Sequence, residues 1–136
     1  MPFELTIVTP EGQAYGGTVD RVVLPGSEGE FGVLANHERF LSPLKIGALE
    51  IQSTEGSLYA AITDGFAEVN GDEVTVLVDS CVMEHEIDFA KADAEMNEAA
   101  QALERAAGDE PERYRQFEAA LEHARARVEV SRKKSS

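Results

Sequence analysis

The sequence predicts a β-rich body followed by a pair of antiparallel helices. Short apolar runs separated by turn residues continue up to about residue 86, and a helical spacing of apolar residues begins at about residue 88. The charge changes at the same point. Residues 1–86 carry 15 acidic and three basic side chains, whereas residues 87–136 carry 11 and nine. We therefore divide the chain into two units, 1–86 and 87–136.

The first strand is indicated by the alternation of Phe3, Leu5 and Ile7 with polar residues, and it ends in a turn at 9–12. The apolar stretch at 19–24 predicts a more fully buried strand. Further strands are expected at 49–51, 58–63, 66–69 and 74–78, the last two joined by a hairpin turn at Asn70-Gly71. Many short strands without helices between them predict an antiparallel sandwich or barrel.

The run 24–37 contains Pro25, three glycines and two acidic residues, Glu28 and Glu30, and ends at His37. Glycine adopts backbone angles that other residues avoid, so the run can turn tightly and approach another chain closely. It holds neither a nucleophile beside a base nor the spacing of metal ligands. We interpret it as a shaped surface loop that docks onto a partner.

Two apolar stripes predict the helices. The first contains Phe89, Ala92, Met96, Ala99, Leu103 and Ala106, and the second contains Tyr114, Phe117, Leu121, Ala124 and Val128. Gly108 suits the end of the first helix, and Asp109 is expected to cap the second, with Pro111 in its first turn. The short connector implies an antiparallel hairpin. Because alanine buries little surface, we expect this hairpin to pack closely but weakly, and to be able to leave its docking surface.

Composition excludes several classes of protein. A chain of 136 residues with 43% hydrophobic residues can form a packed core. Its net charge of −14 argues against nucleic acid and anionic membrane surfaces as partners. The single cysteine, Cys81, is expected to be a small buried core residue in a reducing compartment. No apolar run approaches the roughly 20 residues that span a bilayer, so direct membrane insertion is not expected.

The sequence lacks the motifs of common enzymes. We find neither a nucleophile elbow nor a phosphate-binding loop, and His37, His85 and His123 are far apart. No catalytic residue and no metal site are therefore expected. A stand-alone ligand-binding β-sandwich is the alternative function. Against it stand the absence of tryptophan and an aromatic content of 7%.

Several motifs, in order along the chain, resemble the epsilon subunit of F-type ATP synthase. They are the run 25–34 with His37, Pro43-Leu44, and the runs 47–51, 65–69, 74–77 and 87–88. The resemblance covers nearly the whole chain. It implies a ten-stranded antiparallel β-sandwich followed by an α-helical hairpin. It also implies a non-catalytic central-stalk subunit that turns with the rotor during proton-driven ATP synthesis, at the cytoplasmic face of a bacterial plasma membrane.

The resemblance also implies partners. The β-sandwich would contact the gamma subunit and the c ring, with Glu28 and Glu30 toward the c ring and His37 near gamma. Solvated loop carboxylates and a structural histidine are the plainer interpretations of these residues. The hairpin would either fold against the sandwich or extend toward the alpha/beta catalytic hexamer, where it blocks ATP hydrolysis.

Some bacterial relatives bind ATP on the folded hairpin. The matching positions here are Ile87, Asp88, Lys91, His123 and Arg127. Lysine and histidine replace two of the three arginines of that motif, and neither offers the planar fork that arginine presents to phosphate. We expect ATP binding to be weak or absent, with no other cofactor. The plainer role of Asp88 is to cap the first helix.

The end of the chain is basic. Arg125, Arg127, Arg132, Lys133 and Lys134 supply its positive charges. They either complement the C-terminal end of the helix dipole or, in the extended hairpin, contact acidic surfaces of the catalytic subunits. Arg125, Arg127 and Arg132 are the candidate inhibitory contacts.

Overall fold

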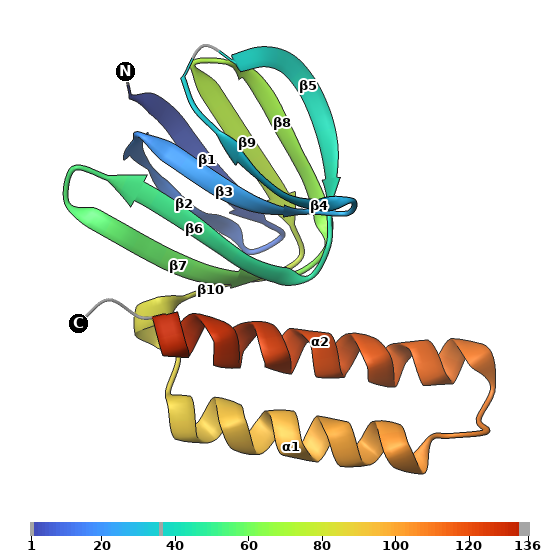
Figure 1. The fold of residues 1–136 in the computed structure, drawn as a ribbon. Helices are drawn as coiled ribbons and strands as arrows, with labels where there is room; N and C mark the ends of the chain where they lie inside the picture. Colours follow the sequence, from blue (N-terminus) through green and yellow to red (C-terminus); the bar gives the residue numbers. More distant parts are fainter. Residues whose placement is uncertain (1, 36, 134–136) are drawn as a thin grey trace.

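The computed structural model describes residues 2–35 and 37–133, and it has two parts (Figure 1). A ten-stranded sheet curls into a nearly closed body, and two helices lie side by side beneath it. The helix nearer the body is the second one, so it lies between the sheet and the first helix. The predicted fold class, a β-sandwich followed by a helical hairpin, is confirmed.

The strands are short and follow one another closely along the chain. They are β1 (Phe3–Thr9), β2 (Gly12–Val19), β3 (Arg21–Gly26), β4 (Gly29–Val33), β5 (His37–Leu44), β6 (Gly47–Ser53), β7 (Gly56–Ile62), β8 (Gly65–Gly71), β9 (Glu73–Val78) and β10 (Cys81–Met83). A 3₁₀ turn, η1 (Glu84–Glu86), leads from the last strand toward the helices.

The sheet has the order β10-β7-β6-β3-β5-β8-β9-β1-β2, with β4 paired to the other side of β3. A single pair, Gly26 with Leu44, joins β3 to β5. One expectation needs correction. β1 and β9 pair in parallel, so the sheet is antiparallel everywhere except at this contact, where the first strand lies beside a strand from the far end of the body.

The core of the body lies between the two halves of the curled sheet. Inward-facing residues of β1 are fully buried, as their alternation predicted, and they pack with inward-facing residues of the other strands. The largest fully buried side chains are Leu5, Ile7, Leu24, Leu49, Ile51 and Ile62. The body is therefore filled by large aliphatic side chains.

The run 24–37 is mostly not a loop, contrary to our interpretation. Its first part forms the β3–β4 hairpin, in which Leu24 pairs with Phe31 and Gly26 with Gly29. Leu24 and Val33 are buried, so two apolar residues anchor the hairpin to the core. Ser27-Glu28 forms the turn of this hairpin, and Leu34 and Ala35 of the run also lie outside the strands. A backbone that alternates between core and solvent forms a strand even where glycines are frequent.

Two turns differ by small shifts from the prediction. The stretch 19–24 is broken at Asp20, so Val19 ends β2 and β3 begins afterwards. Asn70 pairs with Glu73, which makes Gly71-Asp72 the two-residue turn between β8 and β9. Gly71 has a φ of 62°, the left-handed conformation that such turns require.

The helices are α1 (Phe89–Arg105) and α2 (Pro111–Lys133). Asp88 caps α1, because its carboxylate accepts a hydrogen bond of 3.1 Å from the backbone N–H of Ala90. This confirms the capping interpretation. Asp109 is not the cap of α2: the carbonyl of Glu110 accepts the first helical hydrogen bond, and Asp109 pairs with Arg113 at 3.7 Å.

α2 has two buried faces, although one stripe was predicted. Leu121, Ala124 and Val128 are buried, as the stripe requires. Ala126 and Val130 lie off the stripe and are buried as well. A second core cluster contains Ala61, Ile87, Ala92, Ala126, Val128 and Val130, with Ile46, Ala48, Tyr59, Val82 and Met96 packed against it. It joins β6 and β7 to the hairpin through mostly small side chains.

Cys81 is half-buried at the edge of the main core and not fully buried as expected. Burial, followed by the nearby charge of Glu86, raises the pKa of its thiol to about 11. The thiol is therefore protonated at neutral pH, as suits an inert structural cysteine.

We predict that Gly65→Ala destabilises the β body. A Cβ atom at this position would collide with the backbone carbonyl oxygen of Leu77, and backbone cannot move aside cheaply. We expect a loss of about 2–4 kcal/mol, measured by urea unfolding. Gly17→Ala is the control, since its Cβ would meet only the hydroxyl end of Tyr15, at 3.1 Å. Equal stability of the two variants would contradict the close approach.

Candidate functional site

The tip of the β3–β4 hairpin carries two of the predicted contact residues. Glu28 and Glu30 are both exposed, on either side of Gly29, whose φ is 136°. A shallow hollow of about 470 Å³ lies at this tip. Its lining residues are Gly26, Ser27, Glu28, Gly29, Glu30, Phe31, Ser42 and Pro43. The lining combines two carboxylates with the apolar side chains of Phe31 and Pro43, a combination that suits a basic loop of a partner.

His37 opens β5 and pairs with Gly71 of β8. Its side chain lies outside the described part of the structure, so the predicted contact with a shaft subunit stays a prediction. The backbone position alone places His37 at the opposite end of β5 from Pro43 and Leu44, which lie near the hairpin tip.

A site that our sequence analysis missed lies on the outer face of the body. Pro43 of β5 pairs with Phe66 of β8, and Phe66 pairs with Leu77 of β9, so the three side chains form one row across three strands. Leu41 lies two residues along β5 from Pro43, on the same face. Leu41 is 63% exposed, Phe66 50% and Leu77 49%. We call these four residues the apolar row.

Charged residues surround the apolar row. A shallow hollow of about 500 Å³ at one end is lined by Phe66 and Leu77 together with Asp64 and Asp79. A second hollow, of about 290 Å³, lies beside Leu41 and is rimmed by Arg39 and Glu68. An apolar centre with a charged rim is typical of a protein interaction surface.

The sequence contained the signal for this row. Val74, Val76 and Val78 alternate inward along β9, which places Leu77 on the outward side. A large apolar residue at an outward position of a strand indicates either a second core or a partner. Phe66 gives the same signal on β8, because its neighbour Ala67 points into the core.

Three of the five predicted nucleotide residues, Ile87, Asp88 and Arg127, are engaged in contacts within the fold. Ile87 is buried and belongs to the second core cluster, and Asp88 caps α1. Lys91 is exposed. The guanidinium of Arg127 lies 3.9 Å from the carboxylate of Glu95 on α1. Phosphate would have to compete with that carboxylate for the arginine.

His123 is half-buried on α2. Burial lowers the pKa of its imidazole, the positive charge of Arg127 lowers it further, and Asp64 opposes both. The imidazole is therefore mostly neutral at pH 7, and it would add little positive charge to a phosphate site.

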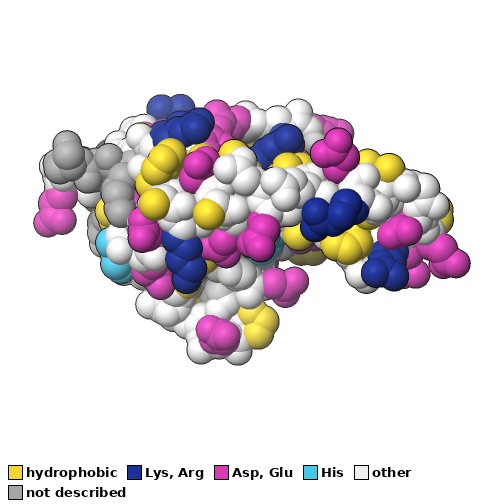
Figure 2. Space-filling view, turned by 90° about the horizontal axis from the view of Figure 1, so that it is seen from below, with side chains coloured by type: hydrophobic (Ala, Val, Ile, Leu, Met, Phe, Trp, Pro, Cys, Tyr) yellow, Lys and Arg dark blue, Asp and Glu magenta, His cyan; other side chains and the backbone are white. Residues whose placement is uncertain are grey.

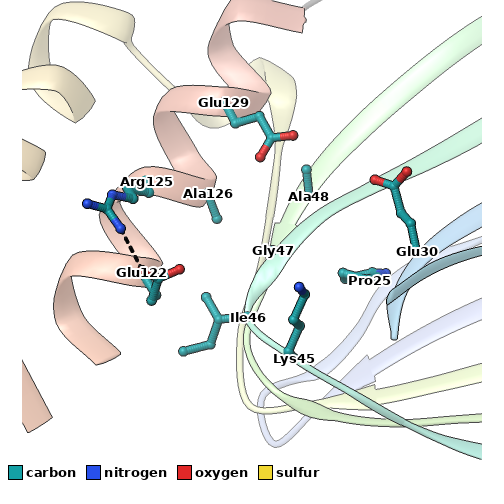
Figure 3. A pocket seen from close by; sticks show the side chains of 10 residues that line it. All are labelled: Pro25, Glu30, Lys45, Ile46, Gly47, Ala48, Glu122, Arg125, Ala126 and Glu129. Atoms are coloured by element: carbon teal, nitrogen blue, oxygen red, sulfur yellow. Dashed lines mark hydrogen bonds and ion pairs between the residues drawn. The ribbon is translucent and has the colours of Figure 1, made fainter. Parts of the chain in front are cut away.

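A cleft of about 310 Å³ runs between α2 and the body (Figure 3). Glu122, Arg125 and Glu129 reach it from α2, and Glu30 and Lys45 reach it from the body. Its apolar lining includes Ile46, Ala48 and Ala126. Glu30 lines both this cleft and the hollow at the tip of the β3–β4 hairpin. It therefore lies where the helical hairpin meets the predicted contact surface of the body.

The candidate inhibitory residues are arranged along α2. Arg125 pairs with Glu122 at 2.8 Å at the edge of the cleft, where both side chains are more than half exposed, and Arg127 faces α1. Arg132 lies over the ring of Phe89 at 5.7 Å. Lys134 lies outside the described residues. Figure 2 views the molecule from the hairpin side and shows acidic and basic side chains interspersed over this face.

Neither a metal centre nor a membrane span is found in the described part of the chain. Within residues 2–35 and 37–133 no three His, Cys, Asp or Glu side chains are grouped so that they would hold a metal ion. No described helix is both long enough and apolar enough to cross a bilayer.

Comparison with known proteins places the chain in a family. Residues 2–84 match the family described as ATP synthase, Delta/Epsilon chain, beta-sandwich domain. The ATP synthase epsilon chain of Syntrophobacter fumaroxidans is 41% identical over 132 residues, which cover 96% of both chains. The chain belongs to the ATP synthase epsilon-chain family. The epsilon chain of Geotalea uraniireducens is 38% identical over 130 residues, covering 96% of this chain and 94% of the relative.

A solved relative has the same architecture. It is a chain in the cryo-EM structure of the Euglena gracilis mitochondrial ATP synthase, described as OSCP/F1/c-ring in rotational state 1. It matches with a TM-score of 0.78 and 28% identity over 92% of this epsilon-family chain and 78% of its own length. A chain from the Tetrahymena thermophila mitochondrial ATP synthase, with a TM-score of 0.52 and 20% identity, shares the fold.

We predict that acidification weakens the folded hairpin through His123. Its pKa is lower in the folded chain than the ordinary value of about 6.5, so the unfolded chain binds more protons as the pH falls through that value. The stabilising effect of the neutral imidazole is therefore present above about pH 6.5 and is lost below it. His123→Gln should reduce the loss of urea stability between about pH 7.5 and 5.

The matched control for this prediction is His85→Gln, which replaces an exposed histidine of η1. The difference in the pH slope between the two variants isolates His123 from the many carboxylates of the chain. Identical slopes would show that His123 does not couple protonation to the fold.

Proposed function

We propose that this chain is a non-catalytic rotor subunit of an F-type ATP synthase, which joins a gamma subunit to a membrane c ring. Membership of the epsilon-chain family supports this role. The observation that carries it is the apolar row on a body filled with large aliphatic side chains. A rotor part has to be stiff and has to bind its neighbours firmly, and it needs no chemistry of its own. The subunit would work peripherally at the cytoplasmic face of a bacterial plasma membrane.

The apolar row is the surface that we assign to the gamma subunit. Leu41, Phe66 and Leu77 expose about half or more of their surface in the isolated chain. Covering such side chains contributes roughly 25 cal/mol per Å² of apolar surface removed from water. The strands beneath them are held by the main core, so binding costs little backbone conformational entropy.

The tip of the β3–β4 hairpin is the surface that we assign to the c ring. Glu28 and Glu30 project from the β3–β4 turn beside an exposed hollow. Two carboxylates on a rigid turn favour basic polar loops as partners, and such a charge pair accelerates association more than it strengthens it. His37 is proposed as a further contact with gamma.

We assign a regulatory role to the hairpin. In the folded form α2 packs on β6 and β7 mainly through alanine and valine, which bury little surface per residue. The hairpin can then leave the body and extend along gamma toward the alpha/beta hexamer. There Arg125, Arg127 and Arg132 would meet acidic surfaces and obstruct ATP hydrolysis.

ATP is proposed to bind this hairpin weakly or not at all. Asp88 is engaged as a helix cap, and Arg127 lies beside Glu95. Lys91 offers phosphate a single point charge. The lowered pKa of His123 removes a second positive charge at pH 7.

We predict that the double variant Phe66→Ser/Leu77→Ser binds a gamma subunit at least about tenfold more weakly, because two central apolar side chains of the interface are lost. Binding would be measured by titrating immobilised gamma. Leu58→Ser is the control, since Leu58 is an exposed leucine of β7 outside the row. Equal affinity of all three chains would place the gamma surface elsewhere, and failure of the unaltered chain to bind gamma would contradict the rotor function.

We predict that removal of residues 87–136 raises ATP hydrolysis by the assembled enzyme, because the shortened subunit keeps its docking surfaces but loses the hairpin. The test is the ATPase rate of complexes reconstituted with full-length or shortened subunit at equal occupancy. An unchanged rate would leave the helices without an inhibitory role, while the rotor function would still stand.

A further inference from the structure

The last turn of α2 closes over the segment that joins the body to the hairpin. Arg132 places its guanidinium 5.7 Å from the centre of the Phe89 ring, at the first residue of α1. Lys133 places its ammonium 5.9 Å from the centre of the Tyr59 ring on β7. Both distances are within the range of cation–π attraction. Two neighbouring cations thus contact two different parts of the fold.

Further interactions hold both partners of the contact between Lys133 and Tyr59. Its ammonium also lies 3.2 Å from the carboxylate of Glu129, one turn earlier in α2. Tyr59 is fixed at its backbone and at its hydroxyl. The backbone N–H donates to Glu84 at 2.9 Å, and the hydroxyl donates to Glu50 at 3.4 Å.

The connecting segment lies next to these contacts. Glu84, which holds the backbone of Tyr59, is in η1 and only 4% exposed. Ile87 follows and is buried with Val130 and Ala92 in the second core cluster. Figure 1 shows the end of α2 beside β10 and the start of α1. Movement of the hairpin about this segment therefore has to separate Lys133 from Tyr59.

The ion pairs between described residues do not hold the hairpin to the body. The four ion pairs formed between described residues all lie within 95–133, so none of them joins the hairpin to the body. The cleft beside α2 mixes charges of both signs, which are Glu30 and Lys45 of the body and Glu122, Arg125 and Glu129 of the helix, and the four ion pairs do not cross it. The contact of Lys133 with Tyr59 therefore gives the hairpin a polar attachment to the body that these ion pairs do not provide.

We propose that Lys133, resting on the Tyr59 ring, is a latch that holds the hairpin folded against the body, and that Arg132, resting on the Phe89 ring, fixes the end of α2 to the start of α1 and so keeps Lys133 in position. The regulatory meaning of the latch rests on the proposed function, but the latch itself is a property of the isolated chain. An acidic surface on a partner would compete for the same two cations. The latch therefore opens where such a surface is offered, because the acidic surface replaces the aromatic rings as the partner of the two cations.

The test is amide hydrogen exchange of the isolated full-length chain. In Arg132→Gln/Lys133→Gln, the amides of residues 121–126 should exchange about tenfold faster, because loss of the contact with Tyr59 and of the Phe89 contact that positions it raises the population of the open hairpin. These amides lie more than one turn before the substitutions, so fraying of the last turn does not affect them. Arg113→Gln/Arg115→Gln removes the same charge from the exposed start of the same helix and should leave the exchange unchanged.

A second pair of variants tests the aromatic side of the latch. Tyr59→Leu removes the ring and keeps an apolar side chain, and it should also accelerate exchange at residues 121–126. Tyr59→Phe keeps the ring without the hydroxyl and should behave as the unaltered chain. The latch is contradicted if the two double variants exchange equally, or if the leucine and phenylalanine variants do.

These outcomes are separate from those of the proposed function. A latch found in the isolated chain, together with an ATPase rate that does not respond to removal of 87–136, would leave the latch standing and contradict the inhibitory hairpin. The converse result, a responsive ATPase and no difference in exchange, would contradict the latch alone.

Discussion

The layer of mostly small side chains between α2 and the body determines how closely the helical hairpin packs on the sheet. Ala61 on β7 meets Ala126 and Val130 on α2 in the second core cluster, with Ala48 of β6 packed against it. Small residues let a helix approach a sheet closely, but each buried methyl group contributes only about 0.8 kcal/mol. The main core instead contains Leu5, whose burial contributes roughly two to three times as much. Each alanine of this layer therefore contributes less to holding the hairpin than a large aliphatic residue contributes to the main core.

The spacing of apolar residues predicted the strands and helices that have one clearly apolar face. β1 alternates cleanly, and α1 and α2 carry continuous stripes, so the sequence indicated their type and order. β2 could not be found in this way, because it contains glycine, glutamine and threonine and has one buried residue at its end. The β3–β4 hairpin was mistaken for a loop because glycines obscured the alternation of Leu24 and Val33.

Other features of the structure depend on contacts between residues far apart in the chain, which local sequence patterns do not reveal. The parallel pairing of β1 with β9 arises when the sheet curls and brings distant strands together. The second buried face of α2 was missed because alanine fits both core and solvent positions, so Ala126 gave no signal. Among the site residues, the capping role of Asp88 was predictable from its position before a helix, whereas the pairing of Arg127 with Glu95 required the two helices to be placed together.

The distribution of charge gives the end of α2 a different kind of attachment from its middle. The body has a large excess of acidic side chains, yet the cleft beside α2 mixes both signs, with Lys45 from the body and Arg125 from the helix among its carboxylates. The four ion pairs between described residues all lie within the hairpin. The middle of α2 is therefore attached mainly by the apolar layer, whereas its last turn adds the contact of Lys133 with the Tyr59 ring. An acidic partner surface that competes for Lys133 would remove this polar contact and leave the apolar layer to hold the helix.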